Sequence, residues 1–168
     1  MTMNKQKILE KLEEIKNLLE EEKTLVFEDH NFKINSDSWK ESTVVDGEEY
    51  KVNPKKDIWE ILDGEAKGEQ LFTWNAAIRE TAEAGKRMPT DEELTELLKA
   101  KEDIPNLVFY GFRDTNGSFG YRTTVAYLWS SAESGSSAWT RSLNSGASAV
   151  YRGADAKAYG FSVRCVKK

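Results

Sequence analysis

The chain has 168 residues, a net charge of −5 and 39% apolar residues, and 18 of its side chains are aromatic. This composition excludes an intrinsically disordered protein, because a chain of this size can bury about 68–70% of its unfolded surface in a core. A helical membrane protein is also excluded, since the sequence contains no run of 18 or more apolar residues. We therefore expect one domain, with no membrane partner.

The charge is divided unevenly along the chain. Residues 1–103 carry 26 acidic and 16 basic side chains, whereas residues 104–168 carry 3 acidic and 8 basic ones. Five excess positive charges spread over a domain are far fewer than the dense basic patches of dedicated nucleic-acid binders. Nucleic acid is therefore a disfavoured partner.

The single cysteine and the N-terminus restrict the chemistry and the location. Cys165 lies in an alternating, strand-like pattern, so we expect a buried, inert thiol. The sequence has no Cys/His cluster with zinc spacing, and we expect neither a metal nor a cofactor. Since the charged N-terminus lacks the apolar core of a secretory signal, we expect the protein in the cytoplasm or carried on a virus particle.

Residues 4–22 are predicted to form a helix with one apolar side. Apolar residues recur there at spacings of three and four, namely Ile8, Leu9, Leu12, Ile15, Leu18 and Leu19. Such a side needs a partner, and docking onto its own domain and oligomerisation both stay open. A monomer is slightly favoured.

The next segment reads as a small antiparallel sheet. Strand-like pieces at residues 24–27, 32–34 and 42–45 alternate with turn residues at 35–37 and 46–47. Asn53 and Pro54 then break the pattern, and residues 57–62 are predicted to form a short helix that carries apolar side chains into the core.

Two helices with clear caps follow. Residues 71–85 contain a helix with Thr73 as its N-cap and Gly85 as its stop. A second helix begins with a Thr-x-x-Glu capping box at Thr90 and turns its leucines inward, namely Leu94, Leu97 and Leu98.

The chain after Pro105 is β-like. Strand-like pieces at residues 107–110, 119–121 and 125–129 flank a tight turn at 114–117.

The last quarter of the chain is dominated by small residues. Between positions 130 and 160, 19 of 31 residues are Ser, Ala or Gly, a composition that is by default a linker. Only eight residues follow this stretch, and a structureless loop of such length is rare in a compact domain, so we expect folded strands with small side chains. Strand alternation puts Trp139, Arg141 and Leu143 on one face, and Thr140 and Ser142 on the other. The two sets therefore point to opposite sides of the strand.

Five motifs in a fixed order carry a resemblance to a known family. They are Trp74 with Ala77 three residues later, GKRMPTDEEL at 85–94, GFRDTNGSF at 111–119, LWSS at 128–131 and GFSVRCV at 160–166. Residues 70–168 thereby resemble the branch of the C-type lectin fold that contains formylglycine-generating-enzyme-like domains and the variable proteins of diversity-generating retroelements.

The resemblance implies the fold class and the domain plan. We expect an α+β, C-type-lectin-like fold in which two helices pack on short antiparallel sheets, with an extra N-terminal helix. The N-terminal amphipathic helix would occupy residues 1–23, and the lectin-like domain residues 24–168. The variable ligand-binding region would cover residues 127–160 or so.

The resemblance also implies how the small-residue stretch arises. In these retroelements a reverse transcriptase miscopies adenines, and AAC codons altered in this way cannot encode Lys, Glu, Gln, Met or Trp. Between positions 134 and 159 only Trp139 and Lys157 fall outside the reachable set. These two are then scaffold, together with Trp129, Arg141, Leu143, Val150, Arg152 and Phe161. A Ser/Ala-rich β surface of ordinary origin has a similar composition, and that alternative stays open.

The implied function is non-catalytic binding of an unknown ligand, a protein or another cell-surface molecule. Tyr151 and Tyr159 are the strongest candidates for affinity, because tyrosine offers a large rigid contact area with a polar tip. The full set of candidate contact positions is Tyr127, Ser134, Ser136, Thr140, Ser142, Ser145, Ala147, Ala149, Tyr151, Gly153, Ala154, Asp155, Ala156, Ala158 and Tyr159.

Two alternatives remain, an undiversified binding or structural domain of the same fold and a formylglycine-generating-type enzyme. The enzyme is disfavoured because those relatives use active-site cysteines, whereas this chain has one cysteine. We also find no nucleophile elbow, phosphate-binding loop or His-centred triad, and so assign no catalytic residues. The calcium-binding signatures of sugar-binding lectins are absent too, and carbohydrate binding is not implied.

Overall fold

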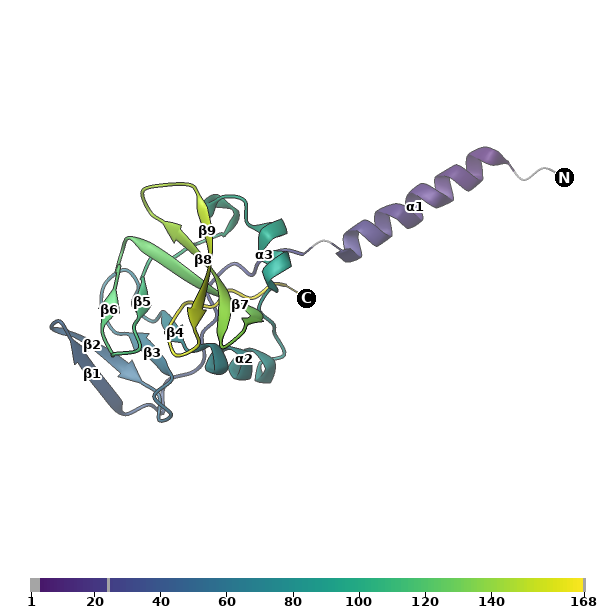
Figure 1. The fold of residues 1–168 in the computed structure, drawn as a ribbon. Coiled ribbons are helices and arrows are strands. Elements are labelled where there is room, and N and C mark those ends of the chain that lie inside the picture. Colours follow the sequence, from purple (N-terminus) through teal and green to yellow (C-terminus); the bar gives the residue numbers. More distant parts are fainter. Residues whose placement is uncertain (1–3, 24, 168) are drawn as a thin grey trace.

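The computed structural model describes residues 4–23 and 25–167 and has an α+β architecture. Three α-helices, one of them N-terminal, accompany three small antiparallel sheets (Figure 1). The N-terminal helix α1 (Lys5–Lys23) confirms the predicted helix and extends away from the other elements. Within the described residues, no helix is both long and apolar enough to cross a membrane.

The first sheet has four strands in the order β1-β2-β3-β4. They are β1 (Glu41–Val45), β2 (Glu48–Val52), β3 (Ile58–Ile61) and β4 (Gln70–Phe72). The predicted turn at 46–47 is confirmed, and both of its residues have positive φ, 50° at Asp46 and 81° at Gly47.

The predicted short helix at 57–62 is wrong, because this segment is strand β3. Its residues pair with β2 on one side and β4 on the other, which buries Ile58 and Trp59 on opposite faces of the sheet. A short apolar run that is buried on both faces has the same pattern in a strand and in a helix, so periodicity could not separate them.

Three other predicted strands are absent as named elements. In the 24–27 piece, Thr24 lies outside the described residues, and Phe27 forms a single bridge to Val166. Residues 32–34 and 107–110 are not assigned as strands, although the Phe32 amide donates to the Val163 carbonyl at 2.7 Å. The first two pieces thus bond to the terminal segment, and Phe109 of the third accepts from the Thr123 amide at 3.0 Å, so none of them forms a sheet of its own.

Both predicted caps are confirmed. Helix α2 (Trp74–Glu83) begins at Thr73, whose hydroxyl accepts from the Ala76 amide at 3.3 Å. Helix α3 (Asp91–Leu97) begins with the capping box, in which the Thr90 hydroxyl and the Glu93 carboxylate each accept from the other residue's backbone amide. As predicted, leucines of this second helix face inward, with Leu94 and Leu98 buried and Leu97 partly buried.

The C-terminal half carries two further sheets. After the short 3₁₀ helix η1 (Lys101–Asp103), β5 (Phe112–Arg113) and β6 (Phe119–Gly120) pair around the predicted turn at 114–117. The small-residue stretch then forms most of β7 (Val125–Ser134), β8 (Ser137–Asn144) and β9 (Val150–Ala156), an antiparallel sheet with β8 in the middle. The prediction of folded strands in place of a linker is confirmed.

The terminal segment, residues 161–166, runs through the centre of the domain. Single bridges join it to Phe72 of β4, Leu128 of β7, Arg87 and Phe27. In this segment Phe161, Val163, Cys165 and Val166 are buried, and the predicted burial of the Cys165 thiol is confirmed. Burial raises the pKa of this thiol to about 12, so it stays protonated at neutral pH.

Arg164 fastens the terminal segment to two earlier segments of the chain. Its side chain is 1% exposed and donates to Asn31 Oδ1 at 3.0 Å and to the backbone carbonyls of Glu28, Pro105 and Asn106. Burial lowers the pKa of the guanidinium, and the four acceptors supply the hydrogen bonds that a buried charge requires. This residue links three segments that lie far apart in sequence.

Candidate functional site

The strand register divides the β7–β9 sheet into two faces. On one face Leu128, Arg141 and Arg152 stand side by side across the three strands. On the other face Tyr127, Ser142 and Tyr151 form the equivalent row. We call the second face the outer face and define it by Tyr127, Ser142, Tyr151, Gly153 and Asp155; we call the first the anchored face.

The anchored face is covered by α3 in the second core. Ala126, Leu128 and Leu143 are buried there against Leu94 and Leu98, with Val150 packed at the margin. This burial explains why the sheet holds its position although it is rich in small side chains.

Asp91, the first residue of α3, is the centre of an ionic network that holds the anchored face. Its Oδ1 accepts from Arg141 Nη1 at 2.8 Å, and its Oδ2 accepts from Arg152 Nη2 at 2.6 Å. Arg141 donates further to the Asp91 carbonyl at 2.9 Å and to the Thr95 hydroxyl at 3.0 Å. The hydrogen bond from Arg152 lowers the pKa of Asp91. Burial of the carboxylate opposes this shift, and Arg141 adds to it.

The Arg152 guanidinium also stacks on an indole. Its central carbon lies 3.5 Å from the centroid of the Trp139 ring, so one arginine joins the helix carboxylate to the face of the sheet. Two strands and one helix are thereby fixed in register by side chains that point away from the outer face.

An aromatic row rises from the core to the edge of the outer face. The Phe112 ring lies 5.4 Å from Tyr127, 5.7 Å from Tyr159 and 5.8 Å from Tyr121, measured between centroids. Below them, Tyr127 and Tyr159 stack on the buried Phe161 at 4.9 and 5.6 Å. These rings are preorganised, since each is held by at least one aromatic neighbour.

A polar group adjoins the aromatic row. The Thr140 hydroxyl donates to Asp155 Oδ2 at 2.7 Å, with the Gly153 carbonyl at 3.1 Å as a second acceptor. Burial, together with the nearby Tyr121, Asp155 and Tyr159, raises the pKa of Tyr127, so its hydroxyl remains a hydrogen-bond donor at neutral pH. The outer face thus offers aromatic surface, hydroxyl groups and one carboxylate.

One predicted contact position is buried, and the prediction that it faces solvent is wrong. Thr140 is 1% exposed, because it lies between Trp129 and Gly153 in the sheet register and its hydroxyl is used by Asp155. Its role is to hold Asp155 on the outer face.

The other predicted contact positions reach the surface at different places. Exposed ones are Ser136, Ser145, Ala147, Ala149, Tyr151, Ala154, Ala156 and Ala158, and half-buried ones are Tyr127, Ser134, Ser142, Gly153, Asp155 and Tyr159. Ala154 and Ala156 pair with Trp139 and Ser137, and so belong to the anchored side. The turns that carry residues 134–136 and 145–149 lie at opposite ends of β8. The predicted set is therefore spread over more than one surface.

The predicted scaffold residues also differ from one another in their exposure to solvent. Trp129, Arg141, Leu143 and Phe161 are buried as predicted, Trp139 and Val150 are half-buried, and the Arg152 side chain is 48% exposed. Lys157 lies 4.7 Å above the Trp74 ring and donates to Glu133 at 2.9 Å.

Three residues at or below this site were missed in the sequence. Phe112 was noted only as part of the motif at 111–119, and Tyr121 only as the end of a strand-like piece at 119–121, where its φ is in fact 53°. Asp91 was correctly assigned to the start of a helix. Its ion pairs with two arginines, 50 and 61 positions later, could not be predicted from the neighbouring sequence.

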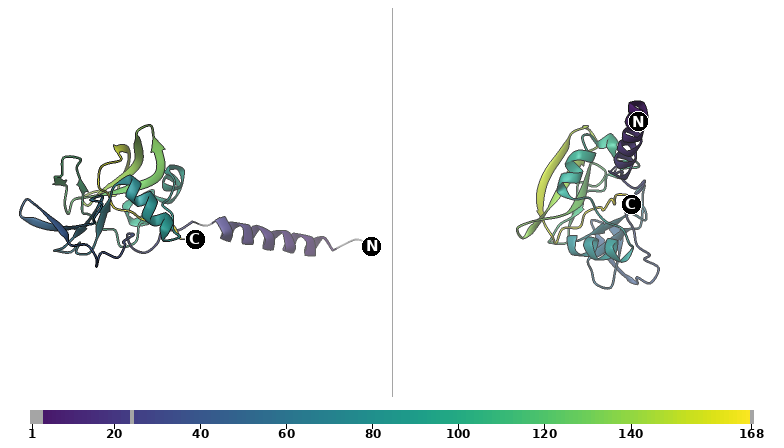
Figure 2. Two further views of the ribbon diagram at one scale, coloured as in Figure 1. Left: turned by 90° about the horizontal axis from the view of Figure 1, so that it is seen from below. Right: turned by 90° about the vertical axis from the view of Figure 1, so that its right-hand side faces the viewer.

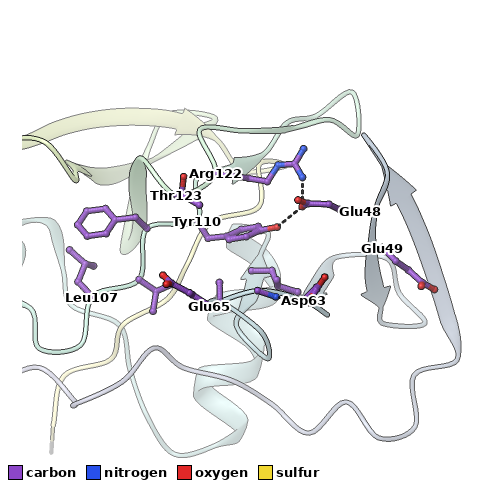
Figure 3. Close-up of a pocket in the computed structure, with 13 residues that line it drawn as sticks. Glu48, Glu49, Asp63, Glu65, Leu107, Tyr110, Arg122 and Thr123 are labelled. Carbon is purple, nitrogen blue, oxygen red and sulfur yellow. Dashed lines mark hydrogen bonds and ion pairs between the residues drawn. The ribbon is translucent and has the colours of Figure 1, made fainter.

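A separate cavity of about 430 Å³ lies beside the first sheet (Figure 3). Glu48, Glu49, Asp63 and Glu65 surround it together with Tyr110 and Arg122, and it shares no residue with the outer face. Burial disfavours the charge on Glu48, but hydrogen bonds from Arg122 and two tyrosines outweigh that effect and lower its pKa. These carboxylates form no metal site, and none of the described residues gathers three or more Asp, Glu, His or Cys side chains in a suitable cluster.

The comparisons with known proteins add no relative to this description. No protein-family model, curated protein or solved structure matches the chain.

Proposed function

We propose that this chain is a non-catalytic binding protein of the C-type lectin fold, whose outer face is diversified by a retroelement. The observation that carries the proposal is the division of one sheet into two kinds of face. The anchored face is held by Asp91, two arginines and a buried leucine cluster. The five residues that define the outer face are partly or fully open to solvent, although Trp129 and Thr140 on the same side of the sheet are buried. A surface that accepts many side chains needs this division.

The energetics favour variation on the outer face. An exchange at an exposed position costs within about 0.5 kcal/mol, whereas truncation of a buried leucine costs about 2–5 kcal/mol. Four exchanges at exposed positions therefore cost about 2 kcal/mol together, well below the stability of about 5–15 kcal/mol of a typical domain. The domain would therefore stay folded after changes that alter which ligand it binds.

The chemistry of the outer face suits a protein or another cell-surface molecule. Tyr151 is 59% exposed, and Tyr127 and Tyr159 present partly open rings that stack on Phe161. Rigid tyrosines provide contact area at low entropic cost, and Asp155 can accept hydrogen bonds from a partner. Binding in place of catalysis is supported by Cys165, whose thiol is buried and protonated.

The DNA around the gene tests diversification directly. We expect a downstream near-copy of the segment that encodes β7–β9, mismatched at template adenines, together with a reverse transcriptase gene. Mismatches spread evenly over the four bases would contradict diversification and leave an ordinary binding domain.

A pair of matched libraries tests the division of faces. In the first, NNC codons replace Ser142, Tyr151, Gly153 and Asp155; in the second, they replace Arg141, Leu143, Val150 and Arg152, which occupy the same two strands. Protease resistance of displayed clones then reports folding. We expect most of the first library and few of the second to resist, and equal fractions would refute the proposed surface.

Binding is tested with variants once a ligand has been selected from a panel of surface proteins. Replacing Tyr151, Asp155 and Tyr159 by alanine is expected to abolish binding and to leave the fold intact. Val44→Ala is the control, since Val44 is 67% exposed on the first sheet, away from the outer face. Binding that survives the triple change would place the contact surface elsewhere.

A further inference from the structure

Helix α1 carries an apolar stripe that no other part of the described chain covers. It extends away from the sheets in Figure 1 and in the left view of Figure 2, and every residue from 4 to 19 is exposed. Along the stripe the exposed fractions run from 40% to 57%, at Ile8, Leu9, Leu12, Ile15, Leu18 and Leu19. Docking onto its own domain, one of the two arrangements expected from the sequence, is not what the structure shows.

A helix in this position needs a partner for its stability. A 19-residue helix is about 28 Å long, and helices of this size gain most of their stability from packing of an apolar side. Six large apolar side chains in water oppose solubility as well. The partner must therefore bury a stripe that runs most of the length of α1.

The stripe has the period and composition of a self-associating coiled coil. In heptad notation Leu12 and Leu19 take position a, and Ile8 and Ile15 take position d, at alternating spacings of four and three. Leucine at a with isoleucine at d favours assemblies of three or four parallel strands over two. This seam is self-complementary, since each layer can be filled by the same residue from every copy.

The flanking positions also favour more than two strands. Leu9 at position e and Leu18 at position g widen the apolar stripe beyond the narrow seam of a dimer. In a parallel dimer, Lys11 at g would face Lys16 at e of the other helix, and like charges there oppose pairing. In a bundle of three or four helices, these lysines instead approach positions b and c of a neighbouring helix. Glu13 and Glu14 occupy those positions, so the charges there are opposite and favour the assembly.

We propose that α1 assembles with α1 of other copies into a parallel coiled coil of three or four chains. The assembly would place several outer faces on one stalk. A ligand surface that repeats, such as that of a cell or a particle, would then be held by several weak contacts at once, which can raise the overall affinity by about 10²–10⁴. The inference rests on α1 alone and holds whether or not the outer face is diversified.

Light scattering of the full chain after size exclusion tests the assembly. We expect a mass three or four times the 19.1 kDa of the chain at a concentration of about 100 µM. A monomer or a dimer at that concentration overturns the proposal.

Matched double variants show whether the stripe is responsible. Leu12→Lys with Leu19→Lys changes two a positions and is expected to give a monomer. Glu10→Lys with Asn17→Lys changes two f positions, seven residues apart on the opposite side of the helix, and is expected to keep the assembly. Near-UV circular dichroism checks the domain in both, because all five tryptophans lie outside α1. Equal masses for the two variants overturn the proposal.

Disulfide cross-linking tests the orientation. Lys5 takes position a one heptad before Leu12, so Lys5→Cys brings equal cysteines together only if the helices are parallel. In an antiparallel bundle the two cysteines would lie about 20 Å apart, too far for a bond. Cys165 does not compete, since it is buried. An assembly that yields no cross-linked chain under mild oxidation overturns the parallel arrangement.

Discussion

Removing the Asp91 carboxylate is expected to destabilise the domain by about 3 kcal/mol, because breaking a buried ion pair from one side costs about 3–5 kcal/mol. The cost falls on Arg141, whose side chain is 3% exposed and would remain charged without its carboxylate partner. It would keep only the Thr140 and Asp91 carbonyls and the Thr95 hydroxyl. For a domain of this size the loss corresponds to a fall in Tm of about 6–12 °C.

Asp91→Ala and Glu92→Ala form a matched pair for this measurement. Glu92 is the next residue of α3 and is exposed, so its change is expected to stay within about 0.5 kcal/mol. Urea unfolding followed by tryptophan fluorescence gives both free energies. A loss below about 1 kcal/mol for Asp91→Ala would refute the view that this carboxylate holds α3 to the sheet.

The pH dependence gives a second readout of the same network. The arginines lower the folded-state pKa of Asp91, so its contribution is fully present above the unfolded pKa of about 4. It is lost as the pH falls through the folded pKa. The stability difference between wild type and Asp91→Ala is therefore expected to be constant at neutral pH and to shrink below about pH 4. A stability difference that grows as the pH falls would contradict a lowered pKa of Asp91 in the folded state.

The remaining predictions concern the core. Gly111→Ala is expected to unfold the domain, because an added Cβ would lie 1.8 Å from the Gly120 carbonyl oxygen. Gly85→Ala is the control, since Gly85 has nearly the same φ but no atom within 4 Å of an added Cβ. In thermal unfolding, the control should lose only about 1 kcal/mol of stability. Arg164→Lys should lose about 2 kcal/mol or more, since an ammonium cannot reach four separate acceptors, and an unchanged urea midpoint would contradict that role. Cys165 should resist thiol reagents in the folded protein and react only after unfolding, and prompt labelling at pH 8 would contradict its burial.

Features with a local cause could be predicted from the sequence. Thr73 and Thr90 cap helices through their own hydroxyls, and the Asp46-Gly47 turn depends only on residues that tolerate positive φ. Strand alternation in β8 likewise separated Arg141 and Ser142 onto opposite faces, because the period of two is a property of the backbone.

Features that depend on distant partners could not be predicted. β3 is a strand because β2 and β4 pair with it, and its four residues carry no period that says so. Strand alternation predicted the face on which Thr140 lies but not that its side chain is buried. Its burial depends on Asp155 on the next strand and on Trp129 on the previous one. The aromatic row around Phe112 also joins segments that no spacing connects.

The central position of residues 161–166 fixes when this protein can fold. Phe72 and Leu128 each bridge to this segment, and Phe27 and Arg87 meet its last residue, so the first half of the chain lacks its partners until these residues have left the ribosome. Strand β4, which bridges to this segment through Phe72, must wait for about ninety further residues to be synthesised. Synthesis and folding are therefore separated in time, and a ribosome that stalls within β9 would hold a chain that no chaperone can bring to its native core.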